Sequence, residues 1–453
     1  MAAEAPNATA GSGKRTGGFV PFLIANLTSQ LGSAAAVLAM AVVASNAGTT
    51  GAAAATYTAL LLTLNFGVAT IVTPYAGRIG HRWGVRRTFI GAQLGGALVF
   101  AAAAALIAAG VPGFPVLLAS APLQGAFGGL SHIVSPLVLR AYAAGEDLAS
   151  AEANLSLTTG AAWVVGAFAG GWLLDSIGAP AALTLDVVLT VPLIAFVGWW
   201  PPAQQPATPH VNHQPWRSLV RSLVASKKLR TASALGVASA LFIAPLTTML
   251  VPITRGLQHD LAVHAAVLLA SLAIGEMLAP VAVKRLKRTG TSIRPSALAL
   301  FLGGVVLVLV ALLVSALDGG AELVAVAAFL IVFGAVTYSA SSFLIAGAAD
   351  SIADDAQAGL AAFFISVGIA TPIGTLLWGR LIDFAGPGSS MLLSGVAMAV
   401  VALATVGVVL WIYRRSAPAN AEGAGTAGQP EQPAEEHGIN LWTRHGLLRR
   451  MLP

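Results

Sequence analysis

The stretch PYAGRIGHRWGVRR, residues 74–87, separates two long apolar segments and carries four arginines. Its three glycines let the backbone bend tightly. A short cationic turn between two apolar segments is typical of a loop that joins two membrane-spanning helices at one face of a bilayer. This stretch therefore predicts a membrane protein, with the arginines gathered on one side.

The same pattern recurs in the second half of the chain. Its proline, alanine, basic and glycine positions reappear at an offset of 206 residues (280 − 74), as Pro280, Ala282, Lys284, Lys287, Arg288 and Gly290. A second set of matches has an offset of 208 residues (383 − 175): Glu146-Asp147, Gly166, Gly171, Leu174-Asp175 and Gly178 recur as Asp354-Asp355, Gly374, Gly379, Ile382-Asp383 and Gly386. The chain is therefore predicted to be two copies of one membrane unit, a known transporter architecture.

The composition agrees with a membrane protein. Of 453 residues, 57% are hydrophobic and 9% are charged, against roughly 25% charged in a soluble domain. The chain has no cysteine, which excludes a disulfide framework, a thiol nucleophile and a cysteine metal site. The net charge of +6 does not indicate nucleic-acid binding, because the basic residues lie in short loops and tails.

The apolar segments give the fold class. Each is near or above the roughly 20 residues that a helix needs to cross a bilayer, and they lie at about 18–45, 52–76, 88–110, 113–140, 150–174, 180–200, 231–254, 262–283, 295–317, 321–348, 357–381 and 389–413. Helices satisfy their own backbone amides in lipid, whereas open strands do not. We predict an all-α membrane protein of about 12 transmembrane helices in two six-helix bundles.

The predicted segments are a cytoplasmic N-terminal tail, an N-terminal bundle, a cytoplasmic linker, a C-terminal bundle and a mostly disordered cytoplasmic tail, at 1–17, 18–200, 201–230, 231–414 and 415–453. Counted loop by loop, nearly all lysines and arginines fall on one side, which is then the cytoplasmic side. The protein is thus expected to be multi-pass in a cell membrane, taken as a bacterial inner or plasma membrane, with both termini inside.

At this point the chain resembles the major facilitator superfamily over about residues 18–414. The family's loop between its second and third helices has the form G-x-L-a-D-r-x-G-r-r-k, and His81 stands here where the family prefers Asp. The resemblance implies the two-bundle fold and a loop that gates the conformational change. The residues of this gate loop in the present chain are Gly77, His81, Arg82, Gly84, Arg86 and Arg87.

Further motifs resemble the efflux branch of that family. Gly166-x-x-x-Gly170-Gly171 is similar to the G-x-x-x-G-P-x-x-G-G signature of drug–proton antiporters, and residues 29–33 resemble macrolide-efflux and siderophore-export members. Ala121 stands where the antiporter branch has an arginine credited with proton coupling. Either coupling uses other groups, or this member is not a standard antiporter.

Three ionisable residues inside the spans are candidates for proton coupling, because such groups are costly at membrane depth and usually face a cavity or a partner. They are Glu276, Asp186 and His132. Each also has a structural interpretation: Glu276 as a partner of the nearby basic turn, Asp186 as a cap or hydrogen-bond partner of a neighbouring helix, and His132 as a packing residue.

Neutral polar and aromatic residues in the spans are candidates to line a substrate cavity. They are Asn26, Gln30, Asn65, Gln124, Asn154, Trp163, Tyr338 and Trp378. The polar residues can equally tie helices together, which is the commoner role. Asp175 and Asp383 lie at the outer ends of their helices and are expected to be solvated.

The leading functional hypothesis is secondary active export of a small, fairly apolar organic compound, such as a drug or secondary metabolite, by alternating access. Coupling to protons is favoured because no nucleotide-binding motif is recognised. The alternative on the same fold is an uptake permease for a nutrient or metabolite. A sensor, scaffold or membrane-embedded enzyme is disfavoured, since no catalytic cluster is evident. No cofactor, metal or nucleic-acid partner is expected, and the protein is expected to be a monomer.

Overall fold

The computed structural model describes residues 18–48, 53–143, 148–200, 223, 226–256, 262–286, 293–316, 320–349, 351 and 356–416. Regular structure in these ranges is entirely helical. The described residues up to Gly407 belong to one compact unit, and 408–416 belong to a second unit that continues the last helix. Several predicted segments lie outside the described residues: the N-terminal tail, most of the linker, both acidic pairs, the repeated turn at 287–290 and the C-terminal tail beyond 416.

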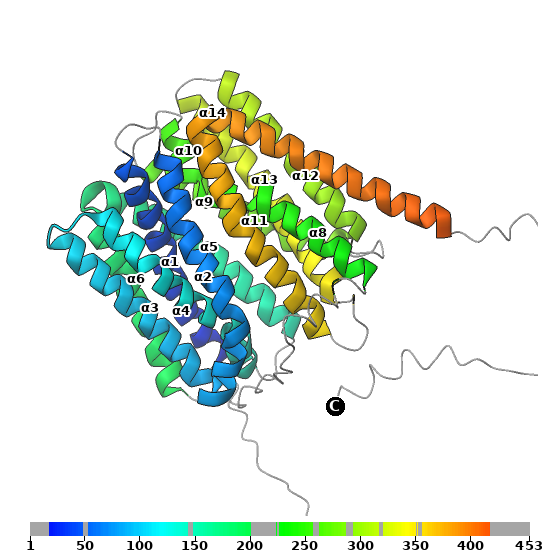
Figure 1. Cartoon of the computed structure of the whole chain (residues 1–453). Helices are drawn as coiled ribbons and strands as arrows, with labels where there is room; N and C mark the ends of the chain where they lie inside the picture. The colour runs from blue at the N-terminus through cyan, green and yellow to red at the C-terminus, as the bar shows by residue number, and fades with distance from the viewer. Residues whose placement is uncertain are drawn as a thin grey trace, which may run out of the picture. The chain divides into compact units, whose positions relative to one another are not determined.

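The first half of the chain forms six long helices. They are α1 (Phe19–Ala47), α2 (Ala54–Trp83), α3 (Val85–Ala108), α4 (Gly113–Tyr142), α5 (Leu148–Ser176) and α6 (Ala179–Trp199). In Figure 1 they run from blue to green and lie side by side. Gly84 and Gly178, with φ of 85° and 106°, immediately precede α3 and α6 and provide the turns into them, because glycine adopts positive φ without steric cost.

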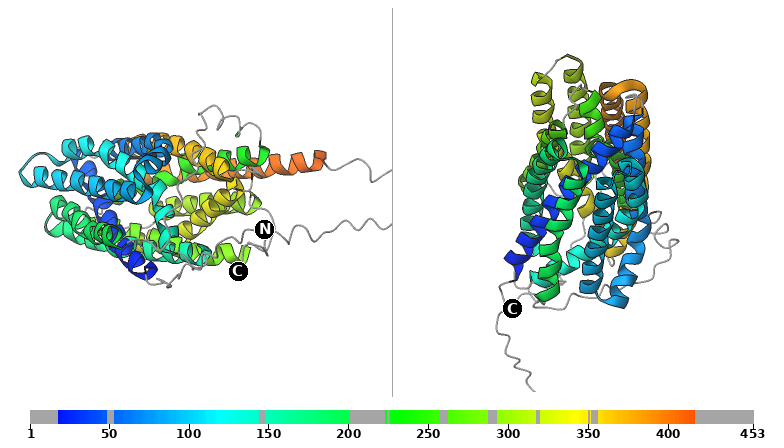
Figure 2. Two further views of the ribbon diagram at one scale, coloured as in Figure 1. Left: turned by 90° about the horizontal axis from the view of Figure 1, so that it is seen from below. Right: turned by 90° about the vertical axis from the view of Figure 1, so that its left-hand side faces the viewer.

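The second half repeats this arrangement with one broken helix. Its elements are α8 (Lys227–Phe242), α9 (Ala244–Thr248), α10 (Leu250–Gly256), α11 (Ala262–Leu286), α12 (Ile293–Ala316), α13 (Gly320–Ala349) and α14 (Ala356–Ser416). Short α9 and α10 continue α8, and each contains a proline, Pro245 or Pro252, which removes a helical N–H. The α14 helix changes direction at Gly386, whose φ is 83°. The two groups of helices stay adjacent in the turned views (Figure 2).

Ten segments of the described chain are long and apolar enough to cross a membrane. The last, Ala362–Gly407, contains the turn at Gly386 and so holds two passes. The 30-residue α4 is not among the ten but packs between α2 and α3 like its neighbours. Dividing the last segment and adding α4 gives twelve passes, in agreement with the predicted fold class.

Helices within each half approach closely at glycines. A Cβ added to Gly129 of α4 would lie 2.6 Å from the carbonyl oxygen of Ala69 on α2, and Gly125 meets the carbonyl of Asn65 in the same way. In the second half, Gly334 of α13 lies against the carbonyl of Leu272 on α11. Small residues matter here because the hydrophobic effect does not drive helices together in lipid. The stabilisation must come from close packing of the helices, which small residues allow.

The arginine-rich turn is anchored to the end of α6. Arg86 donates from its guanidinium to the carbonyl oxygens of Val197 (2.7 Å from Nε) and Gly198. These carbonyls lie in the last turn of α6, where helical partners are missing and a cation is favoured. The Tyr142 hydroxyl donates to the Trp200 carbonyl at 2.6 Å, and its ring stacks on Phe22 with centroids 5.1 Å apart. The α1, α3, α4 and α6 helices are thus joined at this end.

The two halves meet mainly along two helix pairs, α5 with α11 and α2 with α14, and α1 and α2 make smaller contacts with α9, α10 and α11. In the second pair, the Thr70 hydroxyl lies within donating distance of two carbonyl oxygens, that of Gly368 at 3.0 Å and that of Phe66 in its own helix at 2.9 Å. The Gly368 carbonyl has no helical donor, because the residue four positions on is Pro372, which lacks an N–H. Thr63 donates in turn to the Pro372 carbonyl at 3.1 Å. In the first pair, Gly160 of α5 instead packs against the Met277 side chain.

Candidate functional site

Two carboxylates close the interface between the halves at the ends of the helices opposite the arginine-rich turn. Asp175, at the end of α5, accepts hydrogen bonds from the backbone N–H groups of Ala262 (2.9 Å) and Val263 (3.0 Å), which begin α11. The second carboxylate does the same: Asp383 of α14 accepts hydrogen bonds from the backbone N–H groups of Ala55 (3.1 Å) and Thr56 (2.8 Å), which begin α2. Each half therefore uses a carboxylate to cap a helix of the other half.

We call these two contacts the clasps, and the end of the molecule where they lie the clasp face. The first N–H groups of a helix have no partner within the helix, and the helix dipole favours a negative charge there. Sequence reasoning placed Asp175 and Asp383 only as solvated helix ends. Asp175 is exposed and Asp383 is half-buried, but their capping role was missed, since the donors are backbone groups that leave no mark in the sequence.

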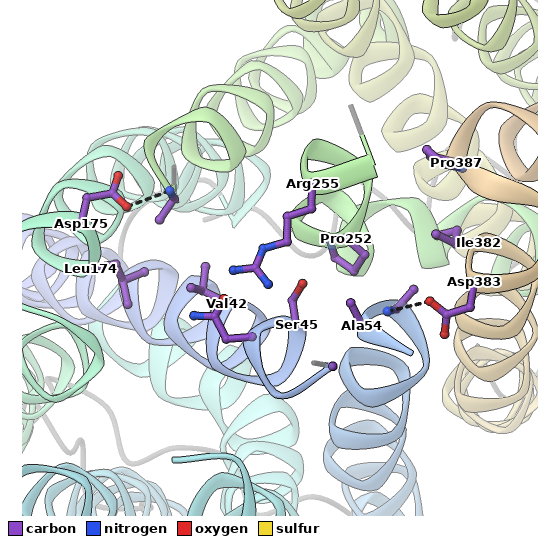
Figure 3. A pocket seen from close by; sticks show the side chains of 14 residues that line it. Val42, Ser45, Ala54, Leu174, Asp175, Pro252, Arg255, Ile382, Asp383 and Pro387 are labelled. Carbon is purple, nitrogen blue, oxygen red and sulfur yellow. Dashed lines mark hydrogen bonds between the residues drawn. The ribbon is translucent and has the colours of Figure 1, made fainter. Parts of the chain in front are cut away.

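A cavity of about 650 Å³ lies between the clasps. Arg255 of α10 extends into the space between Asp175 and Asp383, as Figure 3 shows. Ser45 of α1 also lines this cavity; it is fully buried, and its hydroxyl has no hydrogen-bond partner among the described residues. The halves are therefore joined on this face around a small polar space.

A second cavity, of about 290 Å³, lies inside the N-terminal half between α1, α3, α4 and α6. It brings together four predicted site residues from three helices: Gln30, Gln124, His132 and Asp186. The remaining lining residues are Ser29, Ser33, Ala92, Gln93, Gly96, Ala97, Phe100, Phe127, Gly128, Ser131, Ser135 and Thr190. We call it the N-half cavity.

Asp186 is held in this cavity by a close approach of α6 to α1. Gly32 makes the approach possible, since a Cβ there would lie 2.6 Å from the Asp186 Cα. The Ser33 hydroxyl donates to Asp186 Oδ1 at 3.0 Å, and the hydroxyls of Ser29 and Thr190 are 3.4 Å apart one turn along. Asp186 is only 5% exposed. It thus serves both as a helix-tying residue and as the single carboxylate of the cavity.

Glu276 lies in α11 at the interface of three helices. Its backbone N is 3.2 Å from where a Cβ on Gly334 of α13 would lie, and the next residue, Met277, contacts Gly160 of α5. The side chain is half-buried. Its carboxylate makes no hydrogen bond or ion pair within the described part of the chain. Glu276 is not among the residues that line the N-half cavity.

The other predicted cavity residues divide between tying and packing roles. Gln124 donates to the Gly96 carbonyl at 2.7 Å, and Asn65 donates to the Ala121 carbonyl at 3.4 Å. The Trp163 indole donates to the Gln30 side-chain oxygen at 3.4 Å, which links α5 to α1. The remaining four are placed as follows: Asn26 and Trp378 are buried, and Asn154 and Tyr338 are exposed.

The predicted gate loop forms the junction of α2 and α3. Gly77 and His81 lie in the last turns of α2, Gly84 provides the turn, and Arg86 makes the α6 contacts described above. His81, Arg82 and Arg87 are exposed. Among the described residues, no three His, Asp or Glu side chains gather as a metal site requires.

Twelve membrane passes in two related halves that meet around a polar cavity define a membrane transporter rather than an enzyme. The model of the Major Facilitator Superfamily matches residues 22–368, and the chain belongs to that family. No curated protein sequence matches the chain.

Solved structures of transporters share the fold. The nucleoside transporter NupG superposes with a TM-score of 0.64 at 14% identity, over 86% of this chain and 98% of that one. The human organic anion transporter MFSD10 (TETRAN) superposes with a TM-score of 0.61 at 15% identity, over 86% of this chain and 98% of that one. These similarities confirm the fold and leave the substrate and the direction of transport undefined.

Proposed function

We propose that this protein is a proton-coupled exporter of a small, fairly apolar organic compound. The single observation that carries the proposal is Glu276, a carboxylate within a membrane-spanning helix that has no partner in the described part of the chain. An unpaired charge at this depth is costly, and uptake of a proton removes the cost. A group that must be neutral when enclosed and can ionise when it faces water is suited to proton coupling.

The clasps support the alternating-access part of the proposal. The distribution of basic residues assigns the arginine-rich turn to the cytoplasmic side. The clasps join the halves at the opposite face, which is then the outer one. With both clasps made, access is expected from the cytoplasm; with both broken, from outside. In this proposal both termini are cytoplasmic and the protein acts as a monomer.

Asp186 and His132 remain candidates for a second proton site, because both line the N-half cavity. The proton would then be held in one half at Glu276 and in the other at Asp186 or His132. Ala121, which replaces the arginine expected of the antiporter branch, is fully buried. Proton coupling through Glu276, Asp186 and His132 would not need the arginine that Ala121 replaces.

Uptake of a nutrient or metabolite on the same fold is the alternative, and the structures of similar fold include one described as a nucleoside transporter. At 14% identity this likeness bears on the fold alone. The two directions differ in a simple test. Cells that overproduce the protein should tolerate more of an exported compound, whereas an uptake permease would make them more sensitive or accumulate a nutrient.

The test is a compound-susceptibility panel with and without a protonophore, on cells that produce the wild type, Glu276→Gln or Glu276→Asp. Export coupled through this residue predicts raised tolerance that the protonophore abolishes. The Gln variant should lose the tolerance while remaining in the membrane at normal amounts, and the Asp variant, which keeps a carboxyl group, should retain part of it. Full gradient-driven tolerance in the Gln variant would remove Glu276 from the mechanism.

A further inference from the structure

We infer that the N-half cavity is a binding site for a small organic amine, held as an ammonium ion by Asp186. This inference rests on the proposed function only in taking the bound amine to be the exported compound. The site lies within one half of the molecule, between α1, α3, α4 and α6, and not between the halves.

The charge of the cavity selects the sign of the ligand. Among the described residues that line the cavity, Asp186 is the only acidic one, and none is a lysine or arginine. The other titratable residue is His132, which is neutral at alkaline pH. An anion would therefore meet a buried carboxylate without any compensating cation. A cation would instead supply the missing counter-charge, which a buried carboxylate requires.

The hydrogen bonds around Asp186 leave a place for the amine. Ser33 donates to Oδ1, and Oδ2 has no hydrogen-bond partner among the described residues. An ammonium group carries three N–H donors and a carboxylate can accept about four bonds. Acceptors for the remaining N–H groups are at hand, because ten of the sixteen lining residues are polar, among them Ser131 and Gln93.

The shape of the cavity limits the rest of the ligand. Phe100 and Phe127 supply aromatic surface on the lining, and Ala97 and Gly128 leave room beside them. The volume of about 290 Å³ is just below the roughly 300–1,000 Å³ typical of pockets for drug-sized ligands. The ligand that fits is thus a primary amine with about one ring and a short chain, its apolar end against the phenylalanines.

This assignment also gives an exchange mechanism. A proton and an ammonium ion compete for the same Asp186 carboxylate, so that only one of them is bound at a time. Binding of a proton at Asp186 displaces the amine, with no bond made or broken except the O–H bond of the carboxyl group. Export of the amine and entry of a proton are then linked by exclusion.

The experiment uses the purified full-length protein in detergent at pH 8, titrated by calorimetry with 2-phenylethylamine and with its neutral analogue 2-phenylethanol. The wild type should bind the amine at least about tenfold more tightly than the alcohol, since a charge-assisted hydrogen bond exceeds a neutral one by roughly that factor. Asp186→Asn should lose this preference. Ser131→Leu, which fills the cavity without changing its charge, should weaken both ligands.

Ser233→Ala, in α8 of the other half and not among the residues that line the cavity, is the control, and it should bind the amine as the wild type does. Equal affinity for amine and alcohol in the wild type, or an unchanged amine preference in folded Asp186→Asn, would overturn the inference. If amine binding follows the expected pattern but cells show no proton-dependent tolerance to 2-phenylethylamine, the binding site stands and the proposed export fails. The two ideas are therefore tested separately.

Discussion

Removing a clasp should shift the protein toward the state that is open on the clasp face. In each clasp one carboxylate accepts two backbone N–H bonds of 2.8–3.1 Å across the interface. Water replaces these bonds when the face opens, so the net stabilisation is about 1–2 kcal/mol per clasp, as for an N-cap acceptor. Asp383→Ala should therefore raise the open population roughly tenfold.

The natural absence of cysteine makes the assay direct. Ser45 is fully buried beside the cavity between the clasps, so a cysteine there reacts with an impermeant maleimide only when this face opens. When opening is faster than labelling, the labelling rate follows the open population. Asp383→Ala or Asp175→Ala should speed labelling of Ser45→Cys about tenfold. The double variant should speed it about a hundredfold, because the clasps share no partner.

Ser233→Cys is the matched control, since Ser233 is likewise buried with a hydroxyl that has no partner in the described chain, but it lies in α8 away from the clasps. It should stay unreactive in every variant. An unchanged labelling rate at position 45 in the double variant would refute the gating role. Faster labelling at position 233 as well would indicate general unfolding instead.

Three further predictions concern stability, read from thermal unfolding in detergent. Gly129→Ala should destabilise by about 1–3 kcal/mol through overpacking, whereas Gly128→Ala, whose added Cβ meets nothing within 4 Å, should change little. Thr70→Val should lower the free energy of unfolding by about 1 kcal/mol. The loss should be smaller in a Pro372→Ala background, because the restored N–H of residue 372 donates to the same Gly368 carbonyl. Equal losses in both backgrounds would contradict the role given to Thr70. Arg86→Ala should cost about 1–2 kcal/mol by uncapping α6, with Arg86→Lys intermediate, and an Ala variant as stable as the wild type would count against that contact.

The sequence predicted the membrane passes because bilayer thickness imposes a length and an apolar composition on each helix. Where the prediction missed a detail of the fold, the cause is a local break in a helix. The run at 231–254 was predicted as one span, yet α8, α9 and α10 are separate, and Pro245 and Pro252 were the visible signal. The repeated D-x-x-G at Asp175 and Asp383 was also visible, but only as a repeat.

The site was less predictable than the fold. Gln30, His132 and Asp186 were chosen one by one for their polarity, and nothing in the sequence indicated that α1, α4 and α6 bring them to one cavity. Glu276 was chosen on the same ground, and the structure places it elsewhere, against α13 and α5. Grouping of this kind depends on helix rotation and packing, which glycines such as Gly32 determine through contacts far apart in the chain.

The reciprocity of the clasps has a consequence for how the two halves pair. Each half gives a carboxylate to the other and receives one at the corresponding helix start. In an assembly of identical subunits this would be an isologous contact, the kind that a twofold axis produces. Two separate six-helix halves, each bearing one such aspartate, would make both contacts at once as a symmetric pair, and the single chain holds that pair together covalently.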